Sequence, residues 1–482
     1  MSLLQNDIKT LHELLINKKV TSKELVDESI KLAKEYNSDY NFFVTINEDA
    51  LEKEVTDNLL SGIPCAIKDN LSTANILSTG SSNTLKDYVP FFDATAVKKL
   101  NEANAVDIGK TVMDELGMGG TGTTGHTGIV RSPWDRKRIT GGSSAGSAGA
   151  VAAGIVPYAL GSDTGDSIRK PAAYCGIVGY KPTYGLVSRY GLFPFASSLV
   201  GCLTRNVYDA AVVIDQIKGQ VEHDMTSLPN STEKLVDSLG SDVSSKKLFY
   251  IKEICDINSY DEKTEELKKT LDIFKQTIDK CRDLGMTVGK VSIDRHLLEA
   301  IYPTYVCLSC AEATSNYSNL TGIVFGPRGK GNTINDIMID HRTNGFSPLI
   351  KRRFIIGSYV LQQENQERYF KNAQRVRRLI VNKMNELFEK YDAMILPCSA
   401  KGARTIENNS EEIKTNDILE NHMAIGNFGG FPSITIPNGF VDNMPIGINL
   451  TGKVLDDANI LNIAYNIEKT MNYKNQIAKE LV

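Results

Sequence analysis

The stretch at residues 138–179 constrains the fold of this chain more than any other. It is rich in Gly, Ser and Ala, and its first half carries almost no charge. Small residues let backbone N–H groups come close to a reacting atom, because no large side chain blocks the approach. A flexible linker has a similar composition. However, the segment AVAAGIVPYAL at 150–160 is typical of a buried helix that leads into a buried strand. We therefore expect this stretch to lie in a folded core.

Strand and helix patterns alternate on both sides of that stretch. Residues 63–67 are typical of a buried strand that ends at Lys68, and a capping box at Thr21 predicts the start of a helix. We expect further strands at 105–110, 393–397, 434–437 and 446–450, and further helices at 95–103, 260–285, 362–391 and 456–470. This alternation predicts the α/β class, with helices packed on a β-sheet core.

The chain has 482 residues, of which 41% are hydrophobic and 23% are charged, as in ordinary globular proteins. We interpret residues 1–482 as one domain. The polar segment 219–247 is predicted to be an exposed insertion or the edge of a smaller subdomain. The net charge of −4 argues against binding nucleic acid through bulk charge. A basic cluster at Arg375, Arg377 and Arg378 is expected to be a solvated helix face, with a contact to RNA or a partner as the alternative.

Several classes of protein and site are disfavoured. No apolar run approaches 18 residues and no signal-peptide pattern opens the chain, so we expect no membrane span and a cytoplasmic location. The eight Cys are scattered, which suits a reducing compartment, and Cys307 and Cys310 are interpreted as two buried thiols. The six His lack ligand spacing, so no metal site is predicted.

Three serine chemistries compete in the small-residue stretch. Residues 142–146 match the G-x-S-x-G nucleophile elbow around Ser144, but no buried strand precedes them. Residues 165–168 resemble the short block of GDS-type lipases, although that block lies near the N-terminus in those enzymes. The third possibility combines Ser143, Ser167 and the upstream Lys68. A serine hydroxyl is a poor nucleophile until a base takes its proton, and a buried neutral lysine can act as that base.

The third combination resembles the amidase signature family, in which a serine, a second serine with a cis peptide bond and a lysine work together. The matching motifs are GIPCAIKDN at 62–70, GGSSAGS at 141–147, GSDTGDSIR at 161–169 and GIVGYKP at 176–182. The resemblance covers nearly the whole chain and implies the family's fold, a mixed β-sheet with helices on both faces. It also implies that Lys68 is the base, Ser143 the bridging serine and Ser167 the nucleophile.

The resemblance places an oxyanion hole, a set of N–H donors for the developing negative charge, at the backbone of Thr164, Gly165 and Asp166, up to the nucleophile. Within the family, the motifs at 112–118, 188–198 and 311–316 are most similar to the subunits that release ammonia from glutamine for a tRNA-dependent amidotransferase. The implied partners are a subunit that binds the tRNA and a small third subunit. This chain would need no cofactor, while ATP and Mg²⁺ would bind to the tRNA-binding partner, which would also make most of the tRNA contacts.

Glutamine recognition requires a cation for the α-carboxylate and an anion for the α-ammonium. The resemblance assigns Tyr305 and Arg353 to the substrate, with Arg352 as the rival of Arg353. The acidic position matches Glu420, where most family members have Asp, and Asp417 is the alternative.

Two residues beside the nucleophile depart from the family pattern. Asp166 replaces the usual Gly and Lys170 replaces the usual Gln. A carboxylate that faced the oxyanion hole would oppose the developing negative charge. Our hypothesis is that Asp166 points away from the hole and pairs with Lys170, its i,i+4 neighbour. Two other functions stay open: a stand-alone amidase that acts on a small amide, and a catalytically impaired chain that serves as a scaffold.

Overall fold

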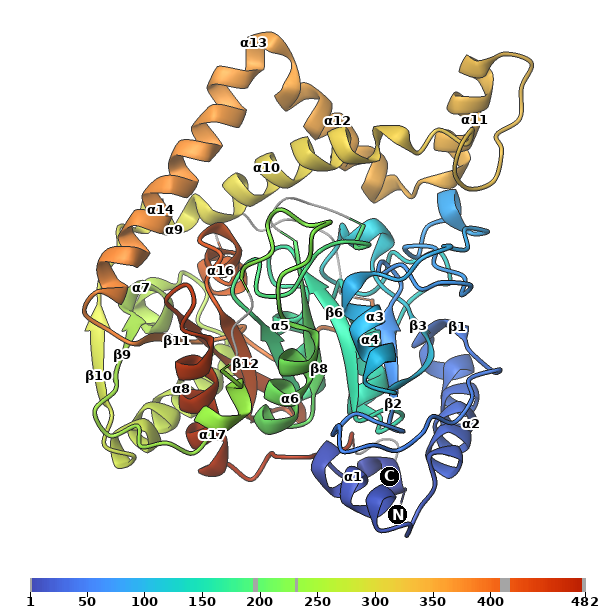
Figure 1. Ribbon diagram of the computed structural model, residues 1–482. Coiled ribbons are helices and arrows are strands. Elements are labelled where there is room, and N and C mark those ends of the chain that lie inside the picture. Colours follow the sequence, from blue (N-terminus) through green and yellow to red (C-terminus); the bar gives the residue numbers. More distant parts are fainter. Residues whose placement is uncertain (1, 194–197, 230–232, 408–416, 479–482) are drawn as a thin grey trace.

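A computed structural model describes residues 2–193, 198–229, 233–407 and 417–478 (Figure 1). Residues 194–197 of the motif at 188–198 and residues 230–232 of the polar segment lie outside these ranges. No helix in the described ranges is long and apolar enough to cross a membrane.

The described residues form one mixed sheet of 11 strands, in the order β1-β3-β2-β6-β8-β7-β12-β13-β11-β9-β10. Strands β2, β3 and β6 run parallel to one another, as do β9, β10 and β11, while β7, β8, β12 and β13 pair with one another in antiparallel fashion. The strands are β1 (Phe43–Ile46), β2 (Pro64–Lys68), β3 (Val106–Thr111), β6 (Tyr158–Asp163), β7 (Val178–Lys181), β8 (Leu199–Thr204), β9 (Lys247–Ile251), β10 (Thr287–Val291), β11 (Ala393–Pro397), β12 (Ser433–Val441) and β13 (Met444–Gly452). A separate hairpin consists of β4 (Arg131–Ser132) and β5 (Asp135–Ile139).

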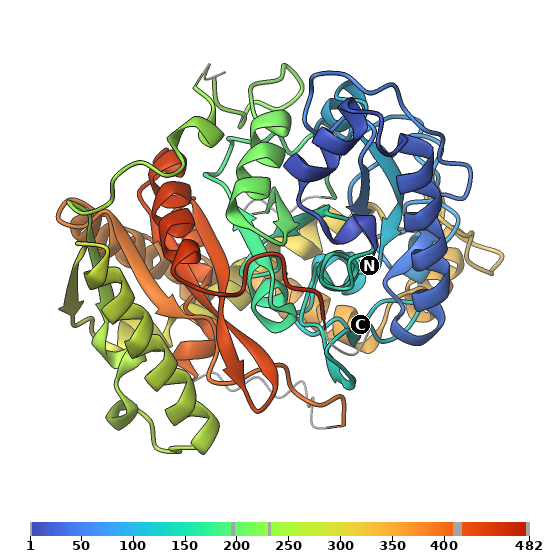
Figure 2. The same cartoon turned by 90° about the horizontal axis from the view of Figure 1, so that it is seen from below.

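Helices cover both faces of the sheet. Successive side chains of a strand point to opposite faces, and those of β2 do so: Cys65 and Ile67 pack in one core, whereas Ala66 packs in the other. The first core lies under α1 (Ile8–Ile16), α3 (Thr95–Glu102), α6 (Val207–Ile217), α8 (Glu265–Asp283) and α17 (Asp457–Lys469). The second core lies under α4 (Ala145–Ala152), α5 (Arg169–Cys175) and the C-terminal half of α2 (Ser22–Tyr40). Figure 2 shows α1, α6, α8 and α17 from below. The predicted α/β fold with helices on both faces is confirmed.

Most of the predicted elements occur close to their expected positions. The small-residue segment at 150–160 ends α4 and enters β6, Lys68 is the last residue of β2, and the capping box at Thr21 opens α2. The long helix expected at 362–391 is divided: a π-helical turn, Gln366–Lys371, separates α13 (Gln363–Asn365) from α14 (Asn372–Phe388). The sequence pattern did not indicate this local widening of the helix.

Further helices lie across the top of the molecule in Figure 1. They are α10 (Ile301–Asn316), α11 (Ile334–Gly345) and α12 (Pro348–Leu361), which were not among the predicted helices. The polar segment 219–247 is largely loop, and its apolar side chains Leu235 and Val243 anchor it to the first core.

Candidate active site

Lys68 is completely buried at the end of β2, where its ammonium group meets the small-residue stretch. Its Nζ donates hydrogen bonds to the Oγ atoms of Ser143 and Ser144, each at 2.8 Å, and to the carbonyl oxygen of Ser162 at 3.2 Å. Burial lowers the pKa of Lys68 to about 7, although the carboxylates of Asp163 and Asp114 oppose this shift. A lysine with this pKa is partly neutral near physiological pH, so it can accept a proton.

Ser143 lies in the loop between β5 and α4, and the Gly142–Ser143 peptide bond is cis. The backbone N–H of Asp114 donates to the carbonyl oxygen of Ser143 at 3.2 Å. The Asp114 carboxylate in turn accepts hydrogen bonds from the backbone N–H groups of Thr121, Gly122, Thr123 and Thr124. Asp114 therefore fixes the loop over this serine. The sequence pattern did not indicate this role, although Asp114 lies within the motif at 112–118.

Ser144, the centre of the G-x-S-x-G match, has a structural role. Its Oγ accepts a hydrogen bond from Lys68 and donates one to the carbonyl oxygen of Ser162 at 3.1 Å. The strand that precedes it, β5, belongs to the small hairpin and not to the main sheet. This arrangement lacks the strand geometry that a nucleophile elbow requires.

Ser167 lies in the turn between β6 and α5, with only 3% of its surface exposed. Its carbonyl oxygen accepts a hydrogen bond from the backbone N–H of Ser144 at 3.1 Å, which ties the two serine clusters together. In the described ranges, no hydrogen bond joins the hydroxyls of Ser143 and Ser167.

The backbone N–H groups of this turn form a candidate anion-binding site. Among the described residues, the N–H groups of Thr164, Gly165, Asp166 and Ser167 donate no hydrogen bond. Buried backbone N–H groups are almost always paired, so this run of N–H donors is available to a ligand. Such donors can stabilise the negative oxygen of a tetrahedral intermediate.

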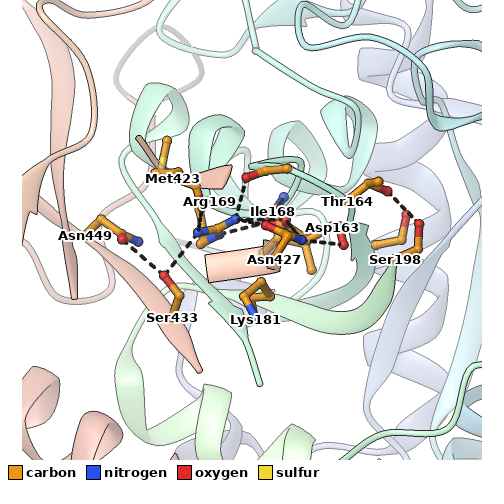
Figure 3. Close-up of polar contacts among 12 residues, drawn as sticks. Asp163, Thr164, Ile168, Arg169, Lys181, Ser198, Met423, Asn427, Ser433 and Asn449 are labelled. Atoms are coloured by element: carbon orange, nitrogen blue, oxygen red, sulfur yellow. Dashed lines mark hydrogen bonds and ion pairs between the residues drawn. The ribbon is translucent and has the colours of Figure 1, made fainter. Parts of the chain in front are cut away.

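A buried ion pair beneath the turn holds it in place (Figure 3). Nε and Nη2 of Arg169 each lie 3.0 Å from a carboxylate oxygen of Asp163, and Nη2 also donates to the carbonyl oxygen of Gly165 at 2.7 Å. Asn427 accepts a further hydrogen bond from Arg169 and donates to Asp163. The side chain of Ser433 on β12 completes the network. These positioning residues were not predicted, although two charged residues, Asp163 and Arg169, within a motif of small residues are a usable signal.

A cavity of about 240 Å³ opens beside the turn. Five of the predicted residues line it: Gly165, Asp166, Tyr305, Arg353 and Glu420. Ser167 and Thr164 do not line it. A Cβ atom added at Gly165 would lie 2.9 Å from the Tyr305 ring, so this ring packs directly on the turn. Burial raises the pKa of Tyr305 to about 12, although the Arg353 guanidinium lowers it.

The predicted ion pair between Asp166 and Lys170 is wrong. Lys170 Nζ instead lies 2.9 Å from Oε2 of Glu420 and also donates to the carbonyl oxygen of Cys398 at 2.8 Å. Burial opposes the charge on both partners, but their attraction prevails: the pKa of Lys170 is raised and that of Glu420 is lowered. Helical spacing brings the backbones of Asp166 and Lys170 together, whereas the long lysine side chain extends to a residue that is distant in the sequence.

Arg352 and Asp417, the alternatives to Arg353 and Glu420, also line the cavity. Arg352 is exposed, whereas Arg353 is half-buried beside Tyr305. Oδ1 of Asp417 accepts a hydrogen bond from the backbone N–H of Glu420. No cluster of potential metal ligands occurs in the part of the chain that the structure describes.

The chain is similar to known proteins over nearly its full length. The family described as Amidase matches residues 24–461. The chain is 37% identical to the A subunit of the glutamyl-tRNA(Gln) amidotransferase of Lacticaseibacillus paracasei and 38% identical to that of a Geobacillus species, and each alignment covers 99% of both chains. The crystal structure of the corresponding protein from Thermotoga maritima superposes with a TM-score of 0.82 at 33% identity and covers 99% of this chain and 98% of its own.

Proposed function

Since this chain belongs to the Amidase family, we propose that it is the glutamine-hydrolysing component of a glutamyl-tRNA(Gln) amidotransferase. The observation that carries the proposal is the buried contact between Lys68 and Ser143, made by a lysine whose pKa lies near 7. Relatives that bear this name and match over the full length supply the substrate class.

In the proposed first step, Oγ of Ser167 attacks the γ-carboxamide carbon of glutamine. The Ser167 proton passes to Ser143, and the Ser143 proton passes to Lys68. The carbonyl oxygen becomes negative and is bound by the N–H groups of the turn at Thr164, Gly165 and Asp166. The buried Asp163–Arg169 pair supports this step because it holds the turn without reorganisation during the reaction.

In the second step, the carbon–nitrogen bond breaks, and the leaving nitrogen takes a proton from Lys68 through Ser143. Ammonia departs and a γ-glutamyl ester remains on Ser167. Water then loses a proton to the same relay and attacks the ester, which releases glutamate and restores the hydroxyl. The route needs no cofactor in this chain.

Ammonia would pass to a partner that binds the misacylated tRNA and activates its glutamyl carboxylate with ATP and Mg²⁺, and a small third subunit would complete the assembly. We also propose a cytoplasmic location, which the eight free cysteines support.

The test is ammonia release from glutamine by the chain alone and together with its co-purified partners. Activity that depends on the partners, and that Ser167→Ala abolishes, supports the proposal. Full activity of the isolated chain on another small amide would favour a stand-alone amidase. Inactivity in both states would favour a scaffold role.

A further inference from the structure

Among the described residues, three carboxylates line the cavity beside Ser167, and they differ in what they contact. Glu420 is paired with Lys170 at 2.9 Å and also accepts a hydrogen bond from the backbone N–H of Ala400 at 2.9 Å. Asp417 caps the short helix that contains Glu420. The Asp166 carboxylate has no hydrogen bond and no ion pair with any described residue.

Lys170 neutralises the negative charge of Glu420, the residue that the family resemblance assigns to the substrate ammonium. Only 6% of the Lys170 side chain and 13% of the Glu420 side chain are exposed. Separating them to admit another cation would leave the buried Lys170 ammonium without a carboxylate partner, which is costly. Glu420 is therefore occupied by a cation that belongs to the protein.

Asp166 is suited to the vacated role. It lines the same cavity as Tyr305 and Arg353, one residue from the nucleophile. Burial raises the pKa of Asp166 to about 6, although Lys170 lowers it. A half-buried carboxylate without a partner is stabilised by a cation that a ligand brings.

We propose that Asp166 binds the α-ammonium group of glutamine while Arg353 binds its α-carboxylate, and that Lys170 has displaced Glu420 from this role. The inference rests on the proposed glutamine hydrolysis. It explains how a carboxylate is tolerated beside the oxyanion hole, since the bound ammonium cancels its charge when the negative oxygen forms. An amide that lacks an amino group leaves Asp166 uncompensated and is a poor substrate.

The experiment compares glutamine with glutaramic acid, which keeps the amide and the carboxylate but lacks the α-ammonium. The readout is ammonia release by the full chain with its co-purified partners, and kcat and KM are measured separately. We expect Asp166→Asn to raise the KM for glutamine by about 10-fold or more and to leave kcat/KM for glutaramic acid unchanged or higher. The selectivity for glutamine over glutaramic acid then falls accordingly.

Two further variants test whether the change in substrate selectivity comes from Asp166 and from the Lys170–Glu420 pair. Asp272→Asn, an exposed position on α8 outside the cavity lining, is the matched control and should keep the selectivity of the wild type. Lys170→Gln releases Glu420, so the double variant Asp166→Asn/Lys170→Gln should regain selectivity for glutamine. Failure to regain it would overturn the assignment of Lys170 as the group that blocks Glu420.

An unchanged selectivity in Asp166→Asn, with wild-type glutamine hydrolysis intact, would overturn the inference alone. An equal loss on both substrates would also overturn it, because Asp166 would then act on the chemistry and not on the ammonium. Absence of glutamine hydrolysis by the wild-type complex would overturn the proposed function, and the inference with it.

Discussion

The ammonium nitrogen of Lys68 lies 2.8 Å from the hydroxyl oxygen of Ser143, in a site that excludes bulk water from both groups. These residues are separated by 75 positions in the sequence. Their contact connects a base to a serine that can pass a proton onward.

The first prediction concerns pH. A base acts in its unprotonated form, and the pKa of Lys68 is lowered to about 7, so kcat/KM for glutamine should fall as the pH drops below about 7, by about tenfold per unit well below that value. Lys68→Arg should be inactive at every pH in the profile, because a guanidinium stays protonated across the whole range in which the enzyme is assayed. A profile that is flat from about pH 5.5 to about pH 8.5 in the wild type would contradict the assignment.

The second prediction separates two adjacent serines that both contact Lys68. Ser143→Ala should lower kcat by about 10²–10⁴-fold, because the proton relay is lost. Ser144→Ala removes a structural hydrogen bond to the carbonyl oxygen of Ser162, so its effect on kcat should be much smaller. Single-turnover measurements with both variants check this difference, and equal losses would show that Ser143 is not a relay.

The third prediction concerns stability. Arg169→Met leaves the fully buried Asp163 carboxylate without its partner, so the free energy of unfolding should fall by about 3–5 kcal/mol. The exposed pair between Arg282 and Asp279 is the control, and Arg282→Met should change that free energy by less than about 0.5 kcal/mol. Urea denaturation measures both variants, and similar values for the two would contradict the positioning role of the buried pair.

The fourth prediction uses two glycines that share a hydrogen bond, from the N–H of Gly142 to the carbonyl oxygen of Gly120. A Cβ at Gly142 would lie 2.0 Å from a carboxylate oxygen of Asp114, whereas a Cβ at Gly120 would meet nothing within 4 Å. Gly142→Ala should therefore cost about 1–3 kcal/mol of stability, and Gly120→Ala should cost less. Thermal unfolding of both variants tests the contrast, which would be refuted by equal melting temperatures.

The sequence predicted the features that depend on local patterns. The strand that ends at Lys68 was predictable from its apolar run, and the start of α2 was predictable from its capping box at Thr21. The family motifs placed Lys68, Ser143 and Ser167 in one site, and Lys68 does contact Ser143.

Features that depend on distant residues could not be predicted in this way. The spacing of Asp166 and Lys170 favoured a local ion pair, but the partner of Lys170 is Glu420, which lies 250 positions away in the sequence. A long side chain at the start of a buried helix can reach partners that only the tertiary fold brings near. The same holds for Asn427, whose amide bridges Asp163 and Arg169 from a helix near the C-terminus.

The turn that contains Ser167 and the residues that hold it in place are far apart in the sequence, and this separation affects how the site forms during synthesis of the chain. Arg169 depends on Asn427 and Ser433, which follow it by 258 and 264 positions. A polypeptide that is still growing on the ribosome therefore holds Ser167 in a turn without these supports until β12 has emerged from the exit tunnel. A chain that stops before β12 lacks these supports, so the proposed release of ammonia requires translation to continue past β12.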